Sequence, residues 1–226
     1  MRSILVWILL LAGVAVAKAQ DDQEYRMEIG AGGGLVNYLG DYNGSLFGSM
    51  QPMGTLTAKY RKNPYSGWAL GISYGQLKGK LSDAGTWYVD EELLPTTFSH
   101  GLIDVSVRYE YNFWAYGTGR EYHGARPLAP FIAFGLGVTH ASASPSVFTM
   151  NVPLGFGVKY KVADRLNLTG EWMMHFSGSD KLDGVADPLS IKSSGLFKNT
   201  DCYSALQLTL TYDIWAKCRT CHNDRD

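Results

Sequence analysis

The sequence predicts an all-β protein: an eight-stranded antiparallel transmembrane β-barrel of the outer-membrane type, followed by a short periplasmic tail. Three observations support this prediction. Eight segments alternate apolar and polar residues with a period of two, which is typical of strands with two different faces. Aromatic residues gather toward the ends of the apolar faces, as they do at the two surfaces of a membrane. The chain also begins with the pattern of an export signal.

The first twenty residues, "MRSILVWILLLAGVAVAKAQ", have the layout of a secretory signal peptide. Arg2 is followed by an apolar run from Ile4 to about Val16 and by a small-residue cleavage pattern ending at Ala19. The run is short for a transmembrane helix, although a retained membrane anchor is the alternative. We therefore expect a signal peptide over residues 1–19, a barrel over 20–215 and a periplasmic tail over 216–226.

The alternation recurs in eight segments, and no helical pattern is found between them. The clearest segment, 103–113, places apolar residues from Ile103 to Phe113 against polar residues such as Asp104 and Arg108. The eight segments are residues 25–35, 54–61, 68–74, 103–113, 132–138, 152–161, 166–175 and 206–214. A soluble β-sandwich also alternates. Here, however, the apolar faces carry the aromatic residues and the polar faces are rich in glycine, which suits a narrow lumen.

A sheet in lipid must pair all its backbone groups, so a spanning sheet has to close on itself. The connections between the segments tend to alternate between long and short, as in outer-membrane barrels with long outer loops and short periplasmic turns. This predicts an outer-membrane location with both termini periplasmic. One periplasmic turn, 115–127, is unusually long and carries Arg120, His123 and Arg126.

The alternation places charged residues on the inward face in equal numbers of each sign. The basic residues are Lys59, Arg61, Arg108, Lys159 and Lys161, and the acidic residues are Glu28, Asp104, Glu110, Glu171 and Asp213. Eight strands enclose only enough space for side chains, and buried charges are tolerated when they are paired. We therefore expect a filled lumen with internal ion pairs and no pore. The net charge of −1 gives no indication of a nucleic-acid partner.

The tail contains the motif "CRTCH", formed by Cys218, Cys221 and His222. The spacing matches covalent haem attachment, a redox pair or part of a zinc site. No apolar segment is present to surround a haem, no helix terminus to activate a thiol, and zinc would need further ligands. We expect no cofactor and no metal here, but a local or intermolecular disulfide. Cys202 begins the last strand at its opposite end, too far away to pair with either cysteine.

The sequence predicts no enzyme, no catalytic residue and no small-molecule substrate. His175 with Ser177 is the nearest approach to a catalytic pair, and His100 and His140 lie near outer strand ends. A nucleophile and its base need a third, orienting group, which the sequence does not identify. The glycine-rich stretch "GAGGG" lacks the strand-to-helix setting of a phosphate-binding loop.

Four stretches carry a resemblance to a known family: "EIGAGGGLVNYLGD", "LTAKYRKNPYSGWALGISYGQLKG", "HFSGSDKLDGV" and "NTDCYSALQLTLTYDI". Together they resemble the PorG-type outer-membrane β-barrel component of the type IX secretion system. The resemblance spans nearly all the mature chain. Its motifs stand in the expected order: Tyr38-Leu39-Gly40-Asp41, Tyr60-Arg61, and Asp180 with Leu182-Asp183-Gly184-Val185. The stretch "DKLDGV" departs from the usual aspartate-tyrosine-leucine-aspartate run. It implies a non-enzymatic barrel that lies among outer-membrane lipids and connects the outer membrane to the periplasmic ring of PorK and PorN.

The resemblance leads to a hypothesis for the tail. So short a segment cannot bury the area of a specific interface, whereas a covalent or metal-mediated link would remove that limit. We expect Cys218 or Cys221 to fix the tail to a ring subunit, with Arg120 and Arg126 as a secondary contact. A frayed tail with a local disulfide is the alternative. A general adhesion or stress barrel of small OmpX/OmpW-like type, and a lipid-modifying enzyme, remain as other functional hypotheses.

Overall fold

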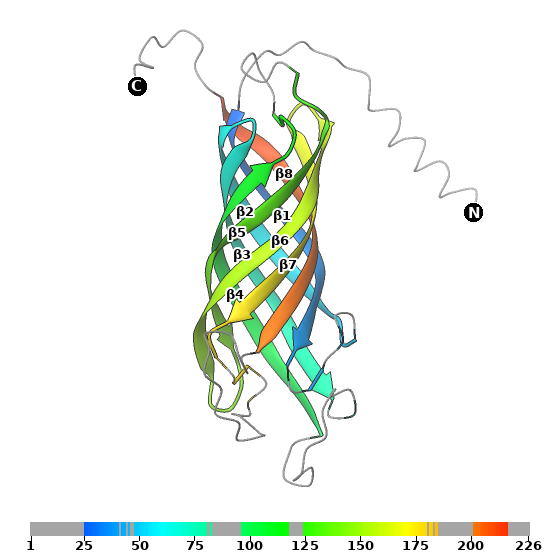
Figure 1. The fold of residues 1–226 in the computed structure, drawn as a ribbon, viewed down its shortest axis with the longest axis vertical. Helices are drawn as coiled ribbons and strands as arrows, with labels where there is room; N and C mark the ends of the chain where they lie inside the picture. The colour runs from blue at the N-terminus through cyan, green and yellow to red at the C-terminus, as the bar shows by residue number, and fades with distance from the viewer. Residues whose placement is uncertain are drawn as a thin grey trace, which may run out of the picture.

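Eight antiparallel strands form a closed barrel in the computed structural model, with each strand hydrogen-bonded to the next and β8 returning to β1 (Figure 1). The structure describes residues 25–40, 42–43, 45, 48–80, 82, 96–117, 124–179, 181–182, 184 and 201–216. The strands are β1 (Tyr25–Leu39), β2 (Gln51–Asn63), β3 (Ser66–Lys80), β4 (Thr97–Asn112), β5 (Leu128–Ala141), β6 (Val147–Ala163), β7 (Leu166–Ser177) and β8 (Cys202–Ala216). The predicted fold class is confirmed.

The strands are strongly staggered around the barrel. When paired residues are followed from each strand to the next around the barrel, the series starts at Met27 of β1. It returns to β1 at Asn37, ten residues further along that strand. The series runs through Met27, Tyr60, Trp68, Tyr109, Phe134, Leu154, Met174, Ser204 and Asn37. With eight strands, such a stagger tilts each strand by roughly 35–45° and leaves an interior that side chains can fill.

The alternation of apolar and polar residues gives each strand an outward face and an inward face. On β3 the residues Trp68, Leu70, Ile72 and Tyr74 face outward and are exposed, whereas the residues between them are buried. Neighbouring outward rings meet across strands, for example Trp68 and Tyr109 with ring centroids 5.2 Å apart. The outward wall is therefore apolar and suited to lipid. Within the described ranges no helix is long and apolar enough to cross a membrane.

The first residue of β1 and the last of β8 lie at the same end of the barrel (Figure 1), which we call the terminal end. The turns at residues 64–65 and 164–165 lie there, and the Asn63 carboxamide oxygen accepts hydrogen bonds from the Tyr65 and Ser66 amides at 2.9 and 2.8 Å. The opposite end, which we call the loop end, contains the longer connections 81–96 and 178–201. Its connection 142–146 is much shorter than expected, because β5 and β6 extend beyond the predicted segments.

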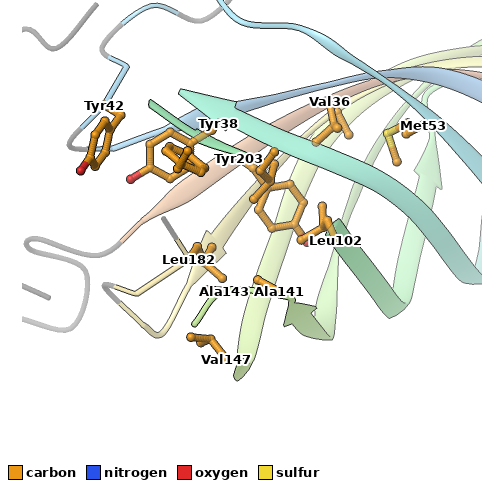
Figure 2. Packing of buried hydrophobic residues seen from close by; sticks show 13 residues of the cluster. Val36, Tyr38, Tyr42, Met53, Leu102, Ala141, Ala143, Val147, Leu182 and Tyr203 are labelled. Carbon is orange, nitrogen blue, oxygen red and sulfur yellow. The ribbon is translucent and has the colours of Figure 1, made fainter. Parts of the chain in front are cut away.

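An apolar cluster fills the barrel at the loop end, and we call it the loop-end cluster. Figure 2 shows Tyr42 next to Tyr38 at one end of the cluster, and the ring of Tyr203 from β8 pointing toward Leu102 and Ala141, with Leu182, Ala143 and Val147 below them. Its members are Val36, Tyr38, Tyr42, Met53, Leu77, Phe98, Leu102, Ala141, Ala143, Val147, Leu182, Tyr203 and Ala205. The Phe98 ring stands edge-on to the rings of Tyr38 and Tyr42, with centroids 4.9 and 5.2 Å apart.

Candidate functional site

The lumen at the terminal end contains a cluster of buried ion pairs. The Arg61 guanidinium binds both Asp213 and Glu28, the Glu28 Oε1 lying 3.1 Å from its Nε. Asp213 also accepts a hydrogen bond from Lys161 Nζ at 2.7 Å and one from Asn167 Nδ2 at 2.9 Å. Two cations therefore meet two carboxylates, which balances the charge of this terminal-end ion cluster.

Tyr116 covers this cluster from the connection between β4 and β5. Its side chain is fully buried, and its hydroxyl donates a hydrogen bond to Asn167 Oδ1 at 2.7 Å. Burial and the nearby Glu28 carboxylate raise the pKa of the Tyr116 phenol well above its usual value. The terminal end of the lumen is thus closed by an aromatic side chain that stays neutral.

In the middle of the lumen one carboxylate lies between two lysines. Glu110 is 3.3 Å from Lys59 Nζ and 2.5 Å from Lys159 Nζ, and all three side chains are buried. The Lys159 ammonium also lies 4.7 Å from the centre of the Phe131 ring, an attractive cation–π distance. The two ammonium groups therefore share one carboxylate, and the stability of this group of side chains depends on Glu110.

A second pair lies beside this group. Arg108 Nη1 on β4 donates to Glu171 Oε1 on β7 at 2.8 Å, across the width of the lumen. A methyl group added at Gly71 would come within 3.5 Å of the Arg108 side chain. That distance is ordinary van der Waals contact, so the guanidinium lies close against this inward face, which agrees with the expectation of a tightly filled lumen.

Asp104 anchors a different, mostly neutral cluster nearer the loop end. Its Oδ2 accepts hydrogen bonds from Asn151 Nδ2 at 2.6 Å, Tyr203 Oη at 2.8 Å and Thr139 Oγ1 at 3.2 Å. His175 Nδ1 lies 3.8 Å from the same oxygen, and its ring stacks on Tyr203 with centroids 4.4 Å apart. Asp104 is thus stabilised mainly by neutral donors, whereas the equal numbers of inward acidic and basic residues suggested that it forms an ion pair.

Asp201 joins two segments of the chain at the loop end, beyond the Asp104 cluster. Its Oδ1 accepts a hydrogen bond from Tyr38 Oη at 2.5 Å, and its Oδ2 accepts one from the Leu182 amide at 2.7 Å. Leu182 itself is fully buried in the loop-end cluster. One carboxylate therefore holds β1 and the start of the β7–β8 connection against the apolar filling of the loop end.

The filled lumen runs from the loop-end cluster to Tyr116, and polar side chains contact one another between these two ends. Hollows that the described residues form include two on the outward wall, one beside Gly33 and Gly170 and the other beside Ala31 and Ala58. Of the ten inward charges expected from the sequence, nine are buried within the lumen and the tenth, Lys161, is nearly so. Contacting side chains therefore occupy the lumen along the part of the barrel that the structure describes.

The structure separates the histidines that were considered as catalytic candidates. His175 belongs to the Asp104 cluster, and the Ser177 hydroxyl donates to the Ser179 carbonyl oxygen at 3.3 Å and accepts from its amide at 3.0 Å. His100 stacks on Phe98, with ring centroids 5.2 Å apart. His140 lies on the outward face of β5, opposite Phe148. The third group near His175 that sequence reasoning missed is Asp104, which is three strands away along the chain.

The predicted partner-binding residues are only partly within the described chain. Arg126 is described: its guanidinium lies over the Trp114 ring, 4.8 Å from the ring centre, and its amide donates to the Ala115 carbonyl at 2.9 Å. Arg120, His123, Cys218, Cys221 and His222 lie outside the described residues, as does the predicted signal peptide. Sequence reasoning also missed Tyr116 and Asp201. Both are buried, but they lie in connections between strands, where no alternation of apolar and polar residues indicates burial.

A closed eight-stranded barrel with an apolar outer wall defines the class of small outer-membrane β-barrels. The sequence matches the family model described as outer membrane protein beta-barrel domain over residues 6–212, and the chain belongs to that family. This agrees with the expected outer-membrane location. A comparison with curated proteins found no match.

Solved structures with a similar fold were also found. Neisserial surface protein A has a TM-score of 0.52 and 15% sequence identity, with 83% of this chain and 97% of that chain covered. The N-terminal β-barrel domain of Pseudomonas aeruginosa OprF has a TM-score of 0.45 and 12% identity, covering 85% and 99%. Ail, the attachment invasion locus protein of Yersinia pestis, has a TM-score of 0.44 and 12% identity, covering 84% and 99%. At such identities the likeness concerns the fold alone.

Proposed function

We propose that this chain is a closed scaffold barrel of the outer membrane that acts through its surfaces, as the membrane anchor of a protein-secretion machine of the type IX kind. The observation that carries the proposal is the filled lumen. Ion pairs occupy its middle, Tyr116 covers one end and the loop-end cluster fills the other. A barrel without a path through it has its end surfaces and its outer wall available for function.

The type IX assignment is supported by the resemblance to PorG-type barrels. The matching motifs occupy the two ends of the barrel: Tyr38 and Leu182 meet at Asp201 at the loop end, and Arg61 joins Glu28 and Asp213 at the terminal end. These residues stabilise the barrel itself. A periplasmic partner of PorK/PorN type would therefore be bound by other residues, and the tail after Ala216 supplies the candidates.

In this proposal both termini lie in the periplasm. The tail carries Cys218 and Cys221 into an oxidising compartment, where disulfides persist. One of them links the tail to a ring subunit, and Arg120 and Arg126 form a secondary contact. The alternative is a local disulfide within a tail that binds nothing.

Cross-linking in intact cells, followed by mass spectrometry of the purified barrel, tests the anchor role. We expect cross-links from the terminal end to large periplasmic proteins. Non-reducing gels of envelope fractions should give a high-mass band that disappears on reduction and in the Cys218→Ser plus Cys221→Ser variant, and Cys202→Ser serves as the control that keeps it. If no periplasmic protein cross-links and secretion is normal without the barrel, the anchor role is wrong; if only the band is missing, the cysteine link alone is wrong.

One observation favours a second candidate, an adhesion or stress barrel. The ends of β3 and β4 continue past the apolar wall as a two-stranded ribbon whose outward residues are polar and exposed, among them Gln76, Lys78, Thr97 and Ser99. A ribbon of this kind could present a binding surface at the loop end. Deleting residues 81–96 distinguishes the candidates, because an adhesin loses attachment to host or matrix surfaces and a secretion anchor does not.

A further inference from the structure

The outward face of β3 and β4 changes from apolar to polar along one line. On β3 the last outward apolar residue is Tyr74, and on β4 it is Ile103, its direct partner across the ladder. The next outward positions on β3 are Gln76, Lys78 and Lys80, all exposed. Because the change occurs at the same register on both strands, we take it as the level at which the acyl chains end.

The two lysines lie just beyond the acyl chains, where Lys78 can reach the lipid headgroups. Lys78 is four residues beyond Tyr74, which is about 13 Å along a strand at ~3.3 Å per residue. A strand tilted by roughly 40° raises this position by about 10 Å. The headgroup layer on each side of a bilayer is about 5–7 Å thick, and a lysine side chain can bend back toward it. Lys78 therefore reaches the headgroup phosphates, and Lys80 lies one step further out.

The lysines are distinctive on this wall. Among the residues that the structure describes, Lys78 and Lys80 are the only lysine or arginine side chains on the outward faces of the strands at the loop end. Elsewhere this wall ends in apolar or uncharged residues, such as Leu35 of β1, Phe148 of β6 and Phe176 of β7. The basic charge is thus confined to one ribbon and adjoins the lipid-facing surface directly.

We propose that Lys78 and Lys80, with the hydroxyls opposite them, bind the phosphate groups of an anionic lipid of the outer leaflet. The ladder places Lys78 opposite Ser99 and Lys80 opposite Thr97. The two lysine positions are about 6.6 Å apart along the strand, and each facing hydroxyl lies about 5 Å away across it. Two ammonium groups and two hydroxyl donors on one face match a headgroup with more than one phosphate. The acyl chains of the same lipid then lie over Ile72 and Tyr74 below.

This inference rests on the orientation proposed above, with the loop end outside, but its test does not. The full-length mature barrel is purified in neutral detergent, and binding of bis-phosphorylated lipid A is measured by native mass spectrometry. The same lipid with its phosphates removed is the second probe. The variants are Lys78→Gln plus Lys80→Gln, the charge-keeping Lys78→Arg plus Lys80→Arg, and Lys181→Gln, an exposed lysine of the loop end outside this ribbon.

We expect the phosphorylated lipid to bind the native barrel more tightly than the dephosphorylated lipid. The double glutamine variant should bind about fivefold more weakly for each lysine removed, while the arginine and Lys181→Gln variants bind as the native barrel does. Heat-modifiable migration on gels checks that each variant is folded. Equal binding of the two lipids, or equal loss in the Lys181→Gln variant, overturns the proposal. An effect of the double glutamine variant without periplasmic cross-links would retain the lipid site and reject only the anchor role.

Discussion

Replacing Glu110 with glutamine should strongly destabilise the barrel. Its carboxylate is the shared partner of Lys59 at 3.3 Å and Lys159 at 2.5 Å, and all three side chains are buried. The amide leaves both ammonium groups without the carboxylate that contacts them directly. Removing one member of a buried ion pair costs about 3–5 kcal/mol, mainly because the other charge stays desolvated. We expect Glu110→Gln to lower the free energy of unfolding by that amount.

Lys159→Met is the matched comparison for Glu110→Gln. This variant leaves one carboxylate with one lysine, so its cost should be smaller than that of Glu110→Gln by at least about 1.4 kcal/mol, a tenfold difference in the unfolding equilibrium. Urea unfolding in lipid bilayers, followed by tryptophan fluorescence and gel mobility, measures both values. Asp164→Asn, the same chemical change at an exposed turn, should stay within about 0.5 kcal/mol of the native barrel. Equal costs for Glu110→Gln and Lys159→Met would refute the shared-carboxylate account.

Three further predictions follow from the two closed ends. The native barrel should show no ion conductance in planar bilayers, and stepwise currents would contradict a filled lumen. Tyr38→Phe removes the hydrogen bond to the Asp201 carboxylate and should cost about 1.5–3 kcal/mol in the same urea assay, whereas Tyr65→Phe, at an exposed site, should cost almost nothing. The third concerns alkaline pH. Because the pKa of Tyr116 is raised above its unfolded value of 10.0, the stability it contributes is complete below pH 10 and is lost as pH rises beyond it. Tyr116→Phe should therefore lose less stability above pH 10 than the native barrel does; an equally steep loss would contradict the burial of the phenol.

The faces of the strands could be predicted from the sequence because lipid and lumen impose opposite requirements on neighbouring residues. Segment 103–113 shows this most clearly, since each outward residue from Ile103 to Tyr111 is apolar and each inward residue between them is polar. Strand ends were harder to predict. Residues 139–150 contain several alanines and serines, which do not alternate visibly, so the extension of β5 to Ala141 and the start of β6 at Val147 were missed.

The partners inside the lumen could not be predicted from the sequence. The alternation identifies which charges face inward, but the stagger of the barrel decides which of them meet. Arg108 of β4 meets Glu171 of β7, and Glu110 of β4 meets Lys159 of β6, so each pair joins strands that are not neighbours in the sheet. For the same reason the equal count of charges did not indicate that Asp104 is held by Tyr203, Thr139 and Asn151.

The pairing of β1 with β8 has a consequence for assembly. Fourteen residue pairs, from Tyr25 with Ala216 to Leu39 with Cys202, join the first strand to the last. Until β8 is available, β1 is an edge strand with unpaired backbone groups. Such groups are costly to place in lipid, and in water an exposed edge can pair with other chains. The seven earlier strands therefore cannot reach a stable membrane-inserted state by themselves. Insertion must wait until β8 is available to pair with β1, and until then the unfinished sheet has to be kept apart from other chains.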